Sequence, residues 1–256
     1  MKLPASALSV ALLLSLPVSA FAQQDVRKEF ESMDQSDDTA GMVELWRENP
    51  RAALSVIDSY LEGSLRVVEK KGDAKEVAAM HTRALRGAKA ASEAFDTPIF
   101  LDYASSFVGW TSEQQKSFRA GQAAFKAAAQ ALGSKDLEKA VAQGNECVRL
   151  ARPLGDWWGT AMGLGILGQA EMQRGNAEAA LEALSQARLI NHDLRLLDDE
   201  LECLLGMTDA LLQLNRSPRA KASAEQGLSL ASAVGNAEAK KAFEERVAKS
   251  TSQPAK

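Results

Sequence analysis

The sequence predicts an all-α fold, a solenoid of helical hairpins preceded by additional N-terminal helices. Alanine recurs every 40 residues, at Ala140, Ala180 and Ala220. Apolar residues keep the same period in three further columns, namely Ala124, Leu164 and Leu204; Leu150, Ile190 and Leu230; and Leu154, Leu194 and Val234. Aromatic residues make up only 5% of the chain, which suits closely packed helices. A repeat of this length is typical of solenoids, because each unit buries its apolar face against the next.

Residues 1–22 have the features of a secretory signal. Lys2 supplies the positive charge, residues 5–18 are mostly apolar, and Ala20-Phe21-Ala22 forms an A-x-A cleavage site. The apolar run is shorter than the roughly 20 residues that a membrane span needs, which favours cleavage over a retained anchor. The short charged region is typical of bacterial signals. We therefore expect export to the periplasm of a Gram-negative cell, with no membrane span after signal cleavage.

The region between the signal and the repeats is expected to be helical but outside the 40-residue register. Residues 23–40, rich in Gln, Asp and Ser, are predicted to be mobile or a frayed helix. In the N-terminal helical region, residues 41–110, Pro50 suits the first position of a helix. Asp73 and Glu76 predict a capping box at the start of a further helix.

Residues 96–110 are rich in aromatic side chains, at Phe100, Tyr103, Phe107 and Trp110. This segment is predicted to be an ordered connector packed on the repeats. The alternative is that it forms the seam between an N-terminal helical bundle and the solenoid.

Residues 111–249 are predicted to form the repeats and a capping helix. Thr111 and Gln114 predict a capping box at the start of the first helix. The hairpins are expected to pair helices 113–132 with 136–152, 157–174 with 176–192, and 198–214 with 218–233. A helix over 236–249, with charged residues on one face, would cover the last unit. Residues 250–256 are predicted to be a disordered tail.

The turn inside each hairpin follows a common pattern. Gly175 suits the left-handed residue that ends a helix, and Asn176 suits the cap of the next helix. Asp136 occupies the same column as Asn176 in the preceding unit. In the following unit the cap is expected one place late, at Ser217, with Pro218 at the first helical position.

Seven residues of the middle unit have the spacing of a known type of helical repeat. They are Leu167, Gly168, Ala170, Gly175, Ala180, Leu184 and Ala187. This spacing resembles that of the tetratricopeptide repeat (TPR), although the usual unit has about 34 residues. The longer unit is similar to that of kinesin light chains. Residues 150–156 and 230–236 share a leucine–alanine stretch followed by a Gly-Asp-type turn, which the middle copy lacks. The resemblance covers residues 113–248.

The resemblance implies a concave face formed by the first helix of each hairpin, and a function in binding other proteins. Carried over by position, that face includes Gln122, Phe125, Ala129, Met162, Gly165, Gln169, Met172, Glu202, Leu205 and Asp209. Trp157 and Trp158 open the same helix as Met162, and tryptophan is enriched at binding hot spots. The face lacks the Lys, Asn and Arg set with which members of the family hold a terminal carboxylate.

Residues 163–168 match G-x-G-x-x-G, the pattern of dinucleotide-binding loops. That pattern needs a preceding strand and a helix that starts within it, whereas these glycines lie inside a predicted helix. We therefore expect no cofactor. Gly168 occupies the close-packing position of the repeat, but Gly163 and Gly165 have no packing role within the unit.

The cysteines and histidines predict neither a disulfide nor a metal site. Cys147 and Cys203 fall on helices that are not neighbours in a solenoid, so two separate buried thiols are expected. His81 and His192 are not spaced as metal ligands with each other or with the cysteines.

No catalytic motif is present, since the chain contains no G-x-S-x-G, H-E-x-x-H or P-loop, and we do not expect an enzyme. The net charge of −4 argues against nucleic acid as a partner. The leading hypothesis is an exported TPR-like scaffold that binds another envelope protein or peptide through its concave face. The alternative is a receptor for a small ligand or glycan, with a pocket near Trp157 and Trp158.

Overall fold

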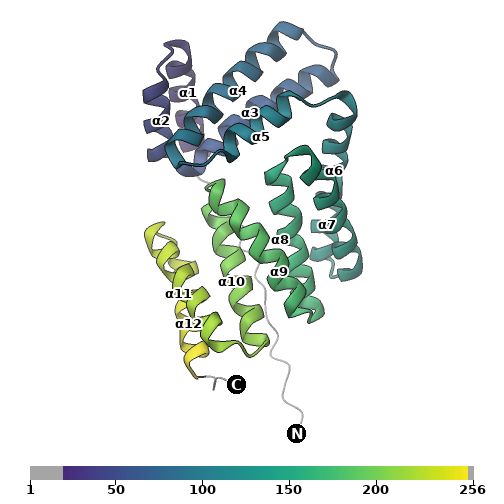
Figure 1. Ribbon diagram of the computed structural model, residues 1–256, viewed down its shortest axis with the longest axis vertical. Coiled ribbons are helices and arrows are strands. Elements are labelled where there is room, and N and C mark those ends of the chain that lie inside the picture. The colour runs from purple at the N-terminus through teal and green to yellow at the C-terminus, as the bar shows by residue number, and fades with distance from the viewer. Residues whose placement is uncertain (1–19, 253–256) are drawn as a thin grey trace.

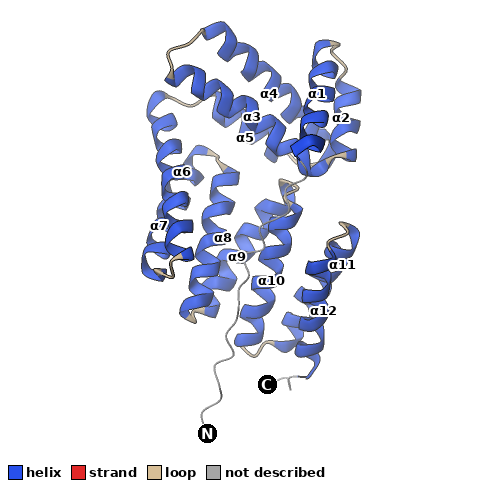
Figure 2. Cartoon of the chain, turned by 180° about the vertical axis from the view of Figure 1, so that it is seen from behind, coloured by secondary structure: helices blue, strands red, loops and turns tan. Residues whose placement is uncertain are grey.

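The computed structural model describes residues 20–252, and these residues form an all-α fold. They contain twelve α-helices, one short 3-10 helix and no strand (Figure 1, Figure 2). In chain order the elements are α1 (Ala20–Gln35), α2 (Thr39–Glu48), α3 (Pro50–Glu69), α4 (Ala74–Phe95), α5 (Ile99–Val108), α6 (Ser112–Gly133), α7 (Leu137–Ala151), η1 (Arg152–Leu154), α8 (Trp157–Arg174), α9 (Ala177–Asp193), α10 (Leu197–Gln213), α11 (Ser217–Ala233) and α12 (Ala237–Ser252). The six hairpin helices begin and end within one residue of their predicted bounds.

The 40-residue period is present in the backbone. The second helices of the hairpins begin at equivalent positions, Leu137, Ala177 and Ser217. The first helices after α6 do the same, at Trp157, Leu197 and Ala237. Left-handed residues mark the turns within hairpins, at Lys135, Gly175 and Asn215, and the turns between them, at Gly155, Arg195 and Gly235. This repetition confirms a solenoid of helical hairpins, in which α12 is the first helix of a fourth unit.

The first helices of the units form one layer of the solenoid. α6, α8, α10 and α12 contact one another in chain order, and each of α7, α9 and α11 packs against the two first helices that flank it. Ala140, Ala180 and Ala220, on the second helices, are fully buried. The alanine columns of the sequence therefore mark places where helices approach closely, because a small side chain lets two backbones come together.

The N-terminal helices α1–α5 share one aromatic core. Phe30 of α1 is fully buried, with its ring 5.2 Å from that of Trp46 and 6.0 Å from that of Tyr60. Residues 23–40 were expected to be mobile or a frayed helix, and most of them form helix α1, which is not frayed but packs on α2 and α3. Its polar composition belongs to the solvent-facing side of that helix, and one buried aromatic ring contributes about 2–3 kcal/mol to holding it in place.

Within residues 96–110, predicted to be an ordered connector packed on the repeats, the structure has the helix α5 over Ile99–Val108. Phe100, Tyr103 and Phe107 are buried in the N-terminal core. Trp110 follows α5, lies 4.3 Å from Phe107 between ring centroids, and donates a hydrogen bond from Nε1 to the Leu154 carbonyl at 2.9 Å. The alternative interpretation of this segment, as the seam between an N-terminal bundle and the solenoid, is the one that the structure supports.

The helix caps differ from the prediction in two hairpins. Asn176 makes no side-chain cap bond, and its Nδ2 donates instead to Glu171. The cap position of α11 is Arg216, in the same column as Asp136 and Asn176, while the Ser217 hydroxyl is buried without a hydrogen-bond partner. The predicted shift of one residue is therefore wrong: the backbone keeps its register because helix packing, and not the cap side chain, decides where α11 begins.

Two other caps were also predicted from sequence. Thr111 and Gln114 form the capping box expected at the start of α6. Asp73 caps α4 through a bond from the Lys75 backbone N–H at 2.8 Å, and Glu76 makes no reciprocal bond. Pro50 occupies the first turn of α3 as predicted.

The sequence predicts a signal over residues 1–22 and a disordered tail over residues 250–256. The predicted signal, residues 1–22, lies outside the described residues except for its last three positions, which begin α1. Residues 250–252 of the predicted tail are helical, and Ser250 is buried; the rest of the tail lies outside the described residues. In the part of the chain that the structure describes, no helix is both long and apolar enough to cross a membrane.

We call the first helices of the hairpins, α6, α8 and α10, the inner helices. The N-terminal bundle, α1–α5, covers their ends, as Figure 1 shows for α3–α5 above α8 and α10. Along α3, from its start to its end, the contacts are made first with α10, then with α8 and last with α6. Arg51 pairs with Asp198 of α10 at 3.2 Å, and Glu62 pairs with Arg119 of α6 at 2.8 Å. Between these two contacts, Asp58 lies within electrostatic reach of Asp156 at the start of α8. The solenoid and the bundle are therefore joined along the whole of α3.

Candidate functional site

The residues predicted to bind a partner lie on three adjacent helices of the first-helix layer, α6, α8 and α10, and all are partly exposed. They are Phe125, Trp157, Trp158, Met162, Gly165, Gln169, Met172, Glu202 and Asp209. Of the further positions implied by the resemblance, Leu205 is buried in a cluster with Leu204 and Phe243. We call the partly exposed side of α6, α8 and α10 formed by these nine residues the inner face.

Trp157 and Trp158 have an internal packing partner. Both indoles are half-buried against the aromatic core of the N-terminal bundle, which also includes Trp110 and Leu154. Directly before them Asp156 caps α8, accepting a hydrogen bond from the Gly159 backbone N–H. The two tryptophans therefore help to hold the bundle on the solenoid, and only part of each ring remains open to solvent.

Phe125 and Met162 have a different environment. Both are partly exposed, and neither belongs to any of the buried clusters of the described residues. In the 40-residue register, Phe125 of α6 is equivalent to Gly165 of α8, and a Cβ atom added at Gly165 would meet nothing within 4 Å. This part of the inner face is apolar, and it is open above Gly165.

The other two glycines of the G-x-G-x-x-G match have packing roles. A Cβ at Gly163 would lie 2.8 Å from Val148 Cγ2, so Gly163 permits the close crossing of α8 and α7. A Cβ at Gly168 would collide with Leu184 of the same hairpin. Packing between units thus explains Gly163, which the sequence of one unit could not, and leaves only Gly165 without a structural reason.

α10 supplies the acidic part of the inner face. Asp209 is held by Arg246 of α12 through two hydrogen bonds of 2.9 and 2.7 Å. Glu202 has no hydrogen bond or ion pair, and neither has its neighbour Asp199. Burial, and then the charges of Asp199 and Asp198, raise the pKa of Glu202 to about 7. The Asp199 side chain is exposed at the surface, although the protein packed around it still raises its pKa, as does the charge of Asp198.

A second group of carboxyls lies where α3, α5 and α8 meet. The Tyr103 hydroxyl donates to Asp58 at 2.5 Å, and Asp156 accepts from the Gly159 backbone N–H at 2.8 Å. Burial raises the pKa of Asp58 to about 7 and that of Asp156 to about 6. Sequence reasoning missed this group, because Asp58 belongs to no motif and its proximity to Asp156 depends on the docking of the bundle.

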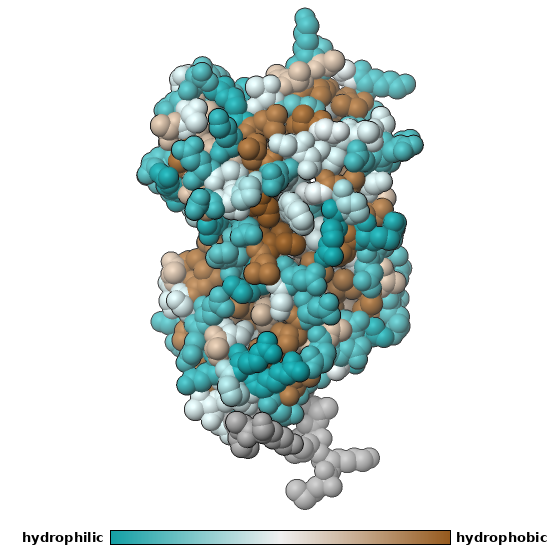
Figure 3. Space-filling view, viewed as in Figure 1, coloured by the Kyte–Doolittle hydropathy of each residue, from teal (hydrophilic) through white to brown (hydrophobic). Residues whose placement is uncertain are grey.

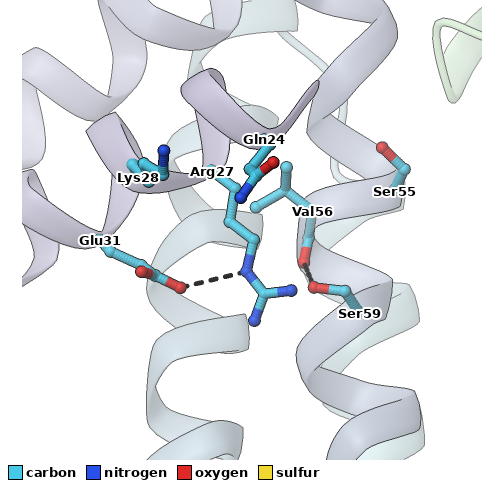
Figure 4. A pocket seen from close by; sticks show the side chains of 7 residues that line it. All are labelled: Gln24, Arg27, Lys28, Glu31, Ser55, Val56 and Ser59. Carbon is cyan, nitrogen blue, oxygen red and sulfur yellow. Dashed lines mark hydrogen bonds and ion pairs between the residues drawn. The ribbon is translucent and has the colours of Figure 1, made fainter. Parts of the chain in front are cut away.

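The structure also has a hollow of about 500 Å³ between α1 and α3 (Figure 4). Its lining consists of Gln24, Arg27, Lys28, Glu31, Ser55, Val56 and Ser59. Arg27 spans the hollow and pairs with Glu31 at 3.1 Å. Neither Trp157 nor Trp158 takes part, so this hollow is not the receptor pocket expected near them.

Cys147 and Cys203 are free and buried, as predicted. Burial raises the pKa of their thiols to about 11 and about 12, which leaves both protonated at neutral pH. Within residues 20–252, no three His, Cys, Asp or Glu side chains come together in a way that could hold a metal ion.

No protein-family model matches the chain, and no curated protein matches it. On the surface seen in Figure 3, apolar side chains are exposed mainly in the middle, where the N-terminal helices meet the solenoid.

Proposed function

We propose that the protein is an exported scaffold of the TPR superfamily, whose inner face binds a segment of another protein in the cell envelope. The TPR assignment is supported by the helical hairpins, by their 40-residue register and by the alternation of left-handed turns. Export is supported by the signal features of residues 1–22. Detection of the mature chain in the periplasm, beginning at Gln23, would test this part; a chain that keeps Met1 would contradict it.

The observation that carries the binding function is the open position at Gly165, with Phe125 and Met162 beside it. A glycine inside a helix costs about 1 kcal/mol relative to alanine. Gly163 and Gly168 offset that cost by close packing, but nothing packs over Gly165. Partly exposed apolar side chains that lie outside the buried clusters, next to a position without a side chain, suit the close approach of another polypeptide.

We propose binding and not catalysis. The inner face supplies phenyl, thioether, amide and carboxyl groups, and no nucleophile paired with a base. The receptor for a small ligand or glycan is the less favoured alternative, because both indoles that it would use pack on the N-terminal core. Replacing Trp158 with Ala should therefore lower stability more than it lowers binding, whereas a receptor would lose binding first.

Site-specific crosslinking tests the proposal. A photoreactive phenylalanine analogue at Met162 of the full chain, activated in the cells that produce the protein, should give one dominant crosslinked partner. The adduct should be lost when Phe125 is also replaced with Ala. The matched control is the same analogue at Leu189 of α9, which is 58% exposed and lies on a second helix, outside the inner face. Equal adducts from both positions would contradict a function of the inner face.

A further inference from the structure

We propose that the segment bound on the inner face is basic: a Lys or Arg side chain of the partner lies against Asp199 and Glu202, and a large apolar side chain lies against Phe125 and Met162. The inference rests on the proposed function, and it names the chemistry of the partner.

The first argument is the charge balance of α10. This helix carries five carboxylates and no Lys or Arg. Three of them are matched within the chain: Asp198 by Arg51, Glu200 by Arg188 and His192, and Asp209 by Arg246. Asp199 and Glu202 are left without a cation. On the neighbouring α8 the only charged side chains, Glu171 and Arg174, pair with each other at 3.1 Å.

Helix-end electrostatics account for only one of these two carboxylates. Asp198, Asp199 and Glu200 lie in the first turn of α10, where the partial positive charge of the helix N-terminus favours anions. Glu202 lies beyond the first turn, where this effect has fallen off. Its side chain is half-buried, and burial together with the charges of Asp199 and Asp198 makes its ionised form costly. A cation from a partner would remove that cost.

The second argument is that the acidic and apolar parts belong to one surface. Gln122, Met162 and Glu202 occupy equivalent positions of α6, α8 and α10, which contact one another in that order. The acidic pair is therefore on the helix next to the apolar part, and Gly165 leaves the backbone of α8 open between them. A segment lying across the inner helices would meet apolar side chains first and carboxylates next.

Charge complementarity decides between kinds of partner. An acidic segment, or the phosphates of a nucleic acid, would bring further negative charge to two unmatched carboxylates. A neutral apolar segment would bury both of them without a partner, which is unfavourable because it removes their hydration and supplies no cation. A segment with a basic residue beside an apolar one satisfies both parts of the surface.

The test uses the purified full chain and three fluorescent peptides of equal length. One alternates Lys and Leu, the second has Glu in place of Lys, and the third has Ser in place of Leu. The Lys–Leu peptide should bind most tightly. Its affinity should fall about tenfold in the double variant Asp199→Asn, Glu202→Gln, and also in Phe125→Ala, Met162→Ala, as expected for one partly buried charged hydrogen bond or one apolar anchor.

The matched control removes two carboxylates from other surfaces. Glu182 of α9 and Glu244 of α12 are exposed and form no ion pair. Glu182→Gln with Glu244→Gln changes the net charge equally and should leave the affinity within about twofold, because exposed charges are screened. An equal loss in both double variants would show general attraction to an acidic protein and would overturn the inference.

The outcomes separate this inference from the proposed function. If the crosslink at Met162 depends on Phe125, but the Lys–Leu and Glu–Leu peptides bind equally, the inner face binds proteins and the basic partner is wrong. If Met162 and Leu189 give equal adducts, the proposed function itself is wrong. Circular dichroism checks the fold of each variant, and Glu202→Gln alone provides the comparison if the double variant is less helical.

Discussion

At the scale of single residues, neighbouring positions of one helix have different roles. Gly163, Gly165 and Gly168 all lie within α8, and the sequence presents them as one motif. Gly163 allows contact with α7, Gly168 allows contact with Leu184, and Gly165 faces open space. Local sequence cannot distinguish them, since the difference depends on what the next helix places opposite each position.

The substitution Gly165→Ala should raise the free energy of unfolding by about 0.5–1 kcal/mol, because alanine restricts the unfolded chain and meets no atom in the folded one. Gly168→Ala should lower it, since the added methyl collides with Leu184. Urea denaturation measures both. If the inner face binds a partner, Gly165→Ala should also weaken the Met162 crosslink. A loss of stability in Gly165→Ala would contradict the open position.

The substitution Ala180→Leu should destabilise the protein by about 1–3 kcal/mol, because overpacking a filled helix crossing forces neighbours apart. Ala180 is fully buried, whereas the adjacent Ala179 is exposed. Ala179→Leu is therefore the control, with an expected change within about 0.5 kcal/mol. Both variants are compared by urea denaturation. Equal stability of the two would mean that the alanine column does not lie at a helix contact.

At the scale of elements, the turn between α9 and α10 shows how the solenoid adapts to the N-terminal bundle. Gly155 and Gly235 hold the left-handed position in two copies of this turn, but Arg195 holds it in the middle copy. The Arg195 guanidinium donates to the Phe95 carbonyl at 3.2 Å and lies 5.1 Å from the centroid of the Phe95 ring. The missing Gly-Asp turn of this copy is thus the point where α10 is attached to the end of α4.

Replacing Arg195 with Ala should destabilise the protein by about 1–2 kcal/mol, since the hydrogen bond and the cation–π contact are lost while the left-handed strain remains. Arg195→Gly loses the same contacts but also removes the strain, so it should be less harmful by about 1 kcal/mol. Thermal unfolding of both variants measures the difference. If Arg195→Ala were as stable as the original chain, Arg195 would not be attaching the two parts.

At the scale of the whole molecule, the N-terminal bundle covers the starts of the inner helices, and α12 covers the last hairpin of the solenoid. α3 crosses the starts of three inner helices and exchanges ion pairs with α6 and α10. Docking also encloses Asp58 and Asp156, with Tyr103, Glu62 and Arg66 around them. Enclosure of carboxyls at this seam makes the stability of the molecule depend on pH.

Stability should fall between about pH 4 and about pH 7. The pKa of Asp58 is raised to about 7, so the folded state holds this proton more tightly than the unfolded chain. The stability that the proton contributes is complete below the ordinary pKa near 4 and is lost as the pH rises through about 7. Asp156, with a pKa of about 6, acts in the same direction, as do Glu202 and Asp199.

The variant Asp58→Asn should reduce this decline, because an amide cannot ionise and still accepts the hydrogen bond from Tyr103. Chemical denaturation at several pH values measures the slope, and Glu182→Gln serves as the control that keeps the original profile. If Asp58→Asn declines as steeply as the original chain, Asp58 is not protonated in the folded state at pH 5.

Sequence alone determined the repeating half of this protein, and tertiary structure decided the rest. The alanine and apolar columns placed six hairpin helices to within one residue, because each unit makes the same contacts with its neighbours and so repeats the same residues. The N-terminal bundle has no such repetition: Phe30 and Asp58 acquire their surroundings from helices distant in the chain.

The inner-face positions followed from the register, but the matching of Asp209 by Arg246, the packing of both tryptophans and the unmatched charges of Asp199 and Glu202 depend on long-range neighbours. Periodic contacts leave a periodic record in a sequence, whereas contacts made once do not.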